Sequence, residues 1–322
     1  MGKDMKEKIE EAKARLVLAA HMSTEYYGKP LIVTYSGGKD SEVLLHLALG
    51  CLRPDEMEVM HNHTTVDAPQ TVYHVRKVFA ELKEMGINAY VRYPMYKGER
   101  TTMWELIEKK QVPPTIRMRY CCDILKESAT PRRYVATGVR SSESTKRRKR
   151  KCFEIRKSGD FPRFDYDHVK EAYEDAHKMG EIWDCTFITA AKKNKNLICN
   201  PVIDWSDEDV WDYIHENEIR CNPLYGMGYK RVGCIGCPLA RPAIQNKEFE
   251  DFPTYKRAYI RAFQKMVEAR RASGKDTEGD TYWNDGESTM RWWLRDPAAK
   301  KVKCGSAGSA DEGGKGEDEK QN

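Results

Sequence analysis

The sequence predicts an α/β protein built on a doubly wound parallel sheet. Apolar runs of strand length alternate along the chain with segments of helical periodicity. The predicted strands lie at 31–35, 57–61, 89–92 and 134–139, and the helices between them at 43–49, 72–85 and 103–109. Because strands that alternate with helices pair in parallel, we expect helices on both faces of the sheet.

The connection between the first predicted strand and its helix carries the clearest functional signal. It reads Ser36, Gly37, Gly38, Lys39, Asp40, Ser41. Glycines let the backbone approach oxygen atoms, and a helix N-terminus with free amides favours an anion. The spacing differs from that of a Walker A loop. It resembles the PP-loop of the ATP pyrophosphatases, which hold the pyrophosphate of ATP and release it while forming an adenylate.

The rest of the chain divides where its composition changes. Apolar positions at helical spacing predict an opening helix, whereas the polar stretch 141–196 interrupts the strand–helix alternation. A strand at 197–199, a helix at 207–216 and a long amphipathic helix at 249–271 follow it. We therefore expect an N-terminal helix, a nucleotide-binding domain with a basic insertion near 141–196, a C-terminal helical region and a disordered acidic tail, at 1–24, 25–245, 246–304 and 305–322.

Composition narrows the class of protein. Of the 322 residues, 40% are hydrophobic and 33% charged, as in a soluble globular protein. No apolar run reaches the roughly 18 residues of a membrane span, and the charged N-terminus lacks a signal-peptide core, so we expect a cytoplasmic protein without membrane contact. The net charge is +5, and the tail from Gly305 carries five acidic and two basic residues, so the body carries +8. That balance weakly favours anionic partners.

Two cysteine pairs stand out among the ten cysteines. Cys121 and Cys122 are adjacent, and Cys234 and Cys237 form a Cys-x-x-Cys turn. Disulfides are not expected in a reducing compartment, so metal binding is the first interpretation. Adjacent side chains diverge, which favours an iron–sulfur cluster, while a zinc ion on four thiolates remains the alternative. The other six cysteines lack partner spacing and are expected to be core or loop thiols.

Several segments together make the chain resemble the sulfonucleotide reductases, which act on adenylyl sulfate (APS) or its 3′-phosphate (PAPS). The segments are Thr64–Pro69, Gly138–Ser144, Asn200–Trp205, Asn222–Tyr225 and the two cysteine pairs. The resemblance implies a [4Fe-4S] cluster on Cys121, Cys122, Cys234 and Cys237. It also implies that Gly138 and Arg140 bind the nucleotide and that Lys126 lies near the cluster. The residues that it implies for catalysis are Lys39, Asp40, Arg140 and Glu143.

Two departures from the reductases favour ATP as the substrate. The reductases have a degenerate loop without the Lys-Asp pair, whereas Lys39 and Asp40 are present here, as in ATP-using relatives such as the DNA phosphorothioation sulfurtransferase. Cys304 lacks the Glu and His that flank the mobile nucleophile of the reductases. The resemblance then implies ATP–Mg²⁺ binding, adenylate formation and sulfur transfer, with a cysteine desulfurase or thioredoxin as sulfur donor. The alternatives are an APS or PAPS reductase with Cys304 as catalytic thiol, and a non-catalytic nucleotide-binding subunit.

Three further features carry two interpretations each. Asp67 either holds Mg²⁺ beside the nucleotide or caps the following helix. His61 and His63 lie on the same side of a strand end, where one is expected to be packed and one exposed, with metal binding as the alternative. The basic run 146–151 is either solvated or grips the backbone of a nucleic acid partner.

Overall fold

The computed structural model describes residues 4–127, 133–143, 147–156, 188–190, 197–275 and 283–295. Its main sheet has seven strands in the order β3-β2-β1-β6-β9-β7-β8. The bounds are β1 (Leu31–Thr34), β2 (Met57–Asn62), β3 (Asn88–Arg92), β6 (Tyr134–Ala136), β7 (Phe153–Arg156), β8 (Ile188–Ala190) and β9 (Leu197–Cys199). All neighbours pair in parallel except β7 and β9, which are antiparallel. The predicted α/β fold with a mostly parallel sheet is confirmed.

The larger core lies on one face of the sheet. Alternate strand residues such as Val33 and Val59 join it, and helices pack over them. These helices are α1 (Met5–Tyr27), α2 (Lys39–Leu49), α3 (Pro69–Glu84) and α7 (Asp207–Glu216). The residues between them on the strands point the other way, and Ile32, Met60 and Val135 form a small buried cluster there.

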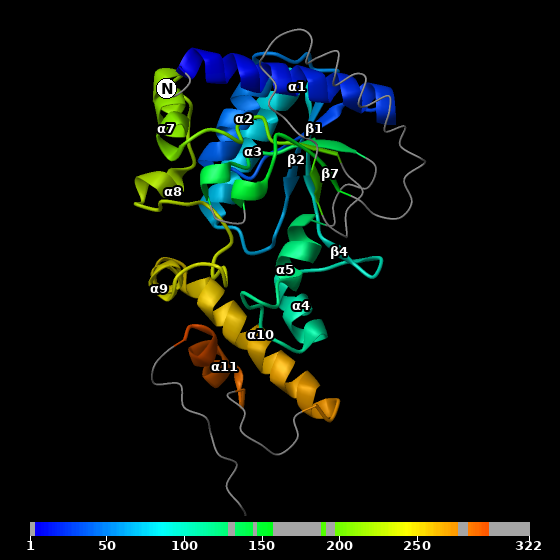
Figure 1. The fold of residues 1–322 in the computed structure, drawn as a ribbon. Coiled ribbons are helices and arrows are strands. Elements are labelled where there is room, and N and C mark those ends of the chain that lie inside the picture. Colours follow the sequence, from blue (N-terminus) through cyan, green and yellow to red (C-terminus); the bar gives the residue numbers. More distant parts are fainter. Residues whose placement is uncertain are drawn as a thin grey trace, which may run out of the picture.

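A second core joins chain segments that are far apart in sequence. Helix α4 (Met103–Lys110) packs along α10 (Pro253–Ala272), which also contacts α11 (Gly286–Trp293). The short helices α5 (Tyr120–Cys122), α8 (Pro223–Gly226) and α9 (Pro242–Asp251) complete this part. Figure 1 shows α4, α9, α10 and α11 below the sheet, with the long α10 running diagonally beside α4. Cys121, Cys122 and Cys234 belong to this second core.

The structure differs from the sequence expectations in three places. The single helix expected at 249–271 is two helices, because Pro253 starts a new one and holds Phe252 out of helical geometry. The polar stretch 141–196, expected to be irregular, contributes β7 and β8 to the sheet. A hairpin of β4 (Met95–Tyr96) and β5 (Glu99–Arg100) was also not expected. Among the described helices, none combines the length and the apolar character that crossing a membrane requires.

Candidate nucleotide and metal sites

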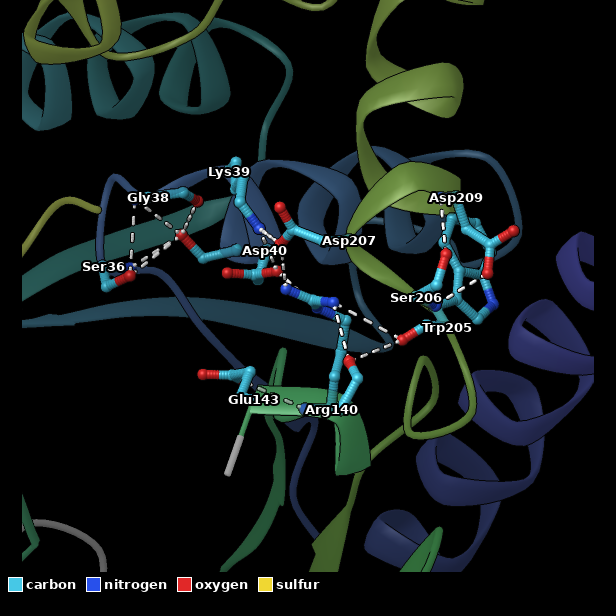
Figure 2. A network of polar contacts seen from close by, with 12 residues as sticks. Ser36, Gly38, Lys39, Asp40, Arg140, Glu143, Trp205, Ser206, Asp207 and Asp209 are labelled. Carbon is cyan, nitrogen blue, oxygen red and sulfur yellow. Dashed lines mark hydrogen bonds and ion pairs between the residues drawn. The ribbon is translucent and has the colours of Figure 1, made fainter. Parts of the chain in front are cut away.

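The 36–41 loop connects β1 to α2 at the carboxyl edge of the sheet, as predicted. Gly37 has a φ of +75°, a conformation that other residues rarely adopt, and Gly38 is the residue before the first turn of α2. The Ser41 hydroxyl gathers the loop, because it accepts from the Ser36 and Gly38 amides at 3.1 and 3.2 Å and donates to the Gly38 carbonyl at 2.8 Å. The loop is therefore held in shape by its own side chains (Figure 2).

A segment from the far end of the domain also holds the loop. The Asn222 amide donates to the Gly37 carbonyl at 3.0 Å, and the Tyr225 hydroxyl accepts from the Lys39 amide at 2.8 Å. Both residues belong to the 222–225 segment that resembles its counterpart in the reductases. Burial raises the pKa of Tyr225, so this hydroxyl stays protonated.

Four charged side chains meet beside the loop. Lys39 Nζ lies 3.2 Å from Asp40 and 2.6 Å from Asp207. Arg140 reaches the same two carboxylates, with Nε 2.6 Å from Asp40 Oδ1 and Nη2 2.8 Å from Asp207 Oδ1. Figure 2 shows all four side chains pointing toward one another. The hydrogen bonds from Lys39 and Arg140 hold the pKa of Asp207 below its usual range, so it is ionised at neutral pH.

Asp207 was not predicted as a site residue. It is the first residue of α7, 168 positions from Lys39 in the sequence, and its side chain is 64% exposed. The signal that points to it is its place two residues after the 200–205 segment. Lys39 and Arg140 are both buried, and both contact this one exposed carboxylate. A phosphate group is also an anion with several acceptor oxygens, so it can make the same contacts with the two cations.

Gly138 and Glu143, two of the predicted residues after β6, have different surroundings. A Cβ atom on Gly138 would lie 2.7 Å from the Asp40 carbonyl oxygen, so the chain after β6 presses directly against the first turn of α2. The Glu143 carboxylate accepts from the Arg140 backbone amide at 3.0 Å and pairs with Arg147. Glu143 thus shapes the turn that carries Arg140, and in Figure 2 it lies away from the Lys39–Asp207 contact. Its predicted catalytic role stays a prediction.

The two cysteine pairs come together in the second core. Cys121 and Cys234 lie in one apolar cluster, and all four cysteines carry free thiols. The turn at Cys234–Cys237 needs Gly236, because its φ is +70° and a Cβ there would meet Phe249 at 2.6 Å. The hydrogen bond from Cys121 lowers the pKa of Cys122, whose sulfur also lies 3.6 Å from Arg119 Nη2. Sequence reasoning did not identify Arg119.

Basic groups balance these thiols. Lys126 lies close to Cys234, whose charge when ionised is the largest cause of the raised pKa of this lysine. Burial raises the pKa of Cys234 itself. Cys152 is disulfide-bonded, contrary to the expectation that cytoplasmic cysteines stay reduced, whereas the other seven described cysteines are free.

Asp67 lies at the cysteine pairs and does not cap α3. Its backbone pairs with Cys234 in an isolated β-bridge, and the Tyr255 hydroxyl donates to its carbonyl at 2.7 Å. The N-cap of α3 is Ala68 and no side chain caps the helix, so that interpretation is wrong. Among the described residues, no ion pair joins Asp67 to Lys39 or Arg140, and its role toward Mg²⁺ stays a prediction.

Cys304 and residues 144–146 lie outside the described residues; Arg147–Lys149 form a short 3₁₀ turn.

The sequence that forms the loop and the two cysteine pairs also matches a known protein family. Residues 30–240, well over half of the chain, match the model of the phosphoadenosine phosphosulfate reductase domain. The chain belongs to this family. The match includes the 36–41 loop, Arg140, Asp207 and all four paired cysteines of this family member.

Individual relatives are more distant. The chain is 28% identical over 311 residues to an uncharacterized protein of Methanocaldococcus jannaschii, covering 94% of the chain and 61% of that protein. It is 26% identical over 205 residues to sulfate adenylyltransferase subunit 2 of Maricaulis maris, covering 62% and 61%. The chain thus spans less than two thirds of either relative. The solved phosphoadenylyl-sulfate reductase of Candida auris is 20% identical, with a TM-score of 0.39, covering 70% of this chain and 93% of that one.

Proposed function

We propose that this protein binds ATP–Mg²⁺ at the 36–41 loop, forms an adenylate with release of pyrophosphate, and uses it for iron–sulfur-dependent sulfur transfer. The observation that carries the proposal is that Lys39 and Arg140 both contact the exposed carboxylate of Asp207, close to the N-terminus of α2. An adenylate-forming reaction develops negative charge on its pyrophosphate leaving group, and preorganised cations stabilise such charge. A relative named sulfate adenylyltransferase subunit 2 supports adenylyl chemistry on this fold.

The side chains divide the work as follows. Lys39 and Arg140 exchange their contacts with Asp207 for contacts with phosphate oxygens, and the α2 N-terminus adds its dipole. Asp40 keeps Arg140 in place, because its Oδ1 accepts from Arg140 Nε at 2.6 Å. Gly138 has no side chain, so the segment after β6 can approach the first turn of α2 closely. Mg²⁺ prefers oxygen ligands, and the carboxylates available here are Asp40 in the loop and Asp207 at the start of α7.

The four free thiols suit an iron–sulfur cluster. A cubane binds four thiolates, and the other three cysteines are all close enough to Cys121 to raise its pKa. Gly236 makes room for the turn that carries two of the thiols, and apolar residues shield them. A bound cluster would orient or supply the sulfur.

One experiment tests the nucleotide chemistry. Anaerobically purified protein is incubated with ATP, APS or PAPS, and pyrophosphate, AMP and sulfite are measured. We expect pyrophosphate and AMP from ATP, and a Lys39→Ala variant that binds ATP more weakly by about 1.5–3 kcal/mol in calorimetry. Lys29→Ala is the control, since Lys29 is an exposed lysine before β1. Equal ATP affinity in Lys39→Ala and wild type would remove the proposal.

The family match favours a second candidate, a sulfonucleotide reductase. That reaction would give sulfite from APS or PAPS with reduced thioredoxin and would require a free thiol such as Cys304. The same assay separates the two, because the reductase makes sulfite and needs no pyrophosphate release. Absence of both products would instead favour a non-catalytic nucleotide-binding subunit.

A further inference from the structure

Three side chains of metal-binding type converge at the end of β2, outside the two cysteine pairs. His61, His63 and Asp67 place one ligand atom each within 4.8 Å of one another. The turn between the strand and α3 brings the carboxylate back over the strand end, and Thr65 in that turn has a φ of +65°. Two of the three residues are buried, with His61 4% and Asp67 7% exposed.

Hydrogen bonds orient two of these ligands from behind. The Tyr35 carbonyl can only accept, so the contact of 2.9 Å from His61 Nδ1 fixes the proton on that nitrogen. The lone pair of Nε2 then lies on the side facing Asp67. The Thr64 amide donates to Asp67 Oδ2 at 2.9 Å. Metal-binding histidines usually donate their other ring nitrogen to a carbonyl or carboxylate in this way.

The separations suit an ion better than direct contacts. His61 Nε2 and His63 Nδ1 lie 3.9 and 3.7 Å from Asp67 Oδ2, which is too long for a hydrogen bond. Ligand atoms about 2.0–2.1 Å from a tetrahedral zinc ion are roughly 3.4 Å apart, so a small inward movement completes the site. Two imidazoles with one carboxylate favour a transition ion over Mg²⁺, which prefers oxygen ligands.

The site lies between the two functional regions. Tyr35, which holds His61, directly precedes the 36–41 loop, and Asp67 pairs with Cys234 through the backbone. We propose that His61, His63 and Asp67 bind one divalent transition ion, Zn²⁺ or Fe²⁺, separately from the cysteine pairs. Three protein ligands leave a coordination position for water or for an anionic group of a substrate, as in catalytic zinc sites.

X-ray absorption on the full-length, anaerobically purified protein loaded with one equivalent of Zn²⁺ tests this proposal. We expect nitrogen and oxygen scatterers at about 2.0–2.1 Å with imidazole features and no sulfur shell near about 2.3 Å. A spectrum dominated by sulfur would place the zinc on the cysteines and overturn the site, and failure to bind Zn²⁺ would do the same. This readout on the wild type does not depend on how any variant folds.

Variants then assign the ligands. His63 is the most accessible of the three, so His63→Ala is the test, and His21→Ala on the exposed face of α1 is the matched control. In competition with a chromophoric chelator, His63→Ala should lose Zn²⁺ affinity by at least about tenfold, since even outer-shell changes cost that much. Unchanged affinity in His63→Ala contradicts the assignment and favours a water-bridged imidazole–carboxylate contact. The proposal on ATP does not enter either measurement.

Discussion

Replacing Gly138 by alanine is the sharpest test of how the nucleotide site is assembled. The added Cβ would lie 2.7 Å from the Asp40 carbonyl oxygen and 2.9 Å from its carbon, where ordinary contacts begin at 3.4 Å. The two segments must therefore separate by about 0.7 Å, and both sides of the contact are backbone. A clash of this kind costs roughly 1–3 kcal/mol of stability, or about 2–10 °C in melting temperature.

The separation acts on binding through Lys39 and Arg140. Asp40 and its neighbour Lys39 open the first turn of α2, and Arg140 follows Gly138 by two positions, so the clash moves the two cations apart. Losing the geometry of one charge-assisted contact with phosphate costs about 1.5–3 kcal/mol, which weakens ATP binding roughly ten- to hundredfold. Calorimetry and thermal melting measure the two effects.

Gly233→Ala is the matched control, because nothing lies within 4 Å of a Cβ at Gly233 and its backbone does not require glycine. We expect it to melt and to bind ATP as the wild type does. If Gly138→Ala behaved the same way, the reasoning that close approach of the two segments sets the cation positions would be refuted.

The remaining predictions concern the thiols and one carboxylate. Anaerobic protein should be brown and hold about four irons per chain, lost when Cys234 and Cys237 are both replaced by serine; colourless protein with one stoichiometric zinc would contradict this. Cys304→Ser, and truncation after Val302, should leave conversion of ATP to AMP and pyrophosphate intact, because adenylate formation needs no thiol; loss of sulfite formation from PAPS in Cys304→Ser would favour the reductase. Burial raises the pKa of Glu248 from 4.5 to about 7. The folded state therefore holds that proton more tightly than the unfolded state, so stability should fall as pH rises from 4.5 to about 7. Glu248→Gln should flatten this dependence in denaturant titrations, and an unchanged slope would show that another group causes it.

The sequence was most informative where local chemistry decides the structure. The helix at 207–216 has its predicted bounds, because Ser206 caps it and acidic residues fill its first turn. The 36–41 loop follows from glycines placed between a strand and a helix. The break at Pro253 was also readable in the sequence, since proline disfavours helix in the residue before it.

What the sequence concealed depends on contacts between distant segments. Asp207 meets Lys39 and Arg140 only because α7 packs beside α2, and an exposed aspartate at a helix start looks like an ordinary first-turn residue. The grouping of His61, His63 and Asp67 depends on a tight turn through Thr65, whose left-handed backbone is not encoded by a glycine. Neither arrangement has a periodicity that a pattern could detect.

The hydroxyl of Tyr225 has a consequence for the order of events. It occupies the Lys39 amide, a donor at the mouth of the α2 N-terminus that an incoming phosphate oxygen also seeks. One donor serves one strong acceptor at a time, so a phosphate oxygen bound to the Lys39 amide would displace the Tyr225 hydroxyl. Tyr225 precedes Cys234 by nine residues. In the proposed reaction, a phosphate oxygen that took the Lys39 amide would therefore free Tyr225, one of two side chains that tie the loop to the stretch leading to the cysteine turn.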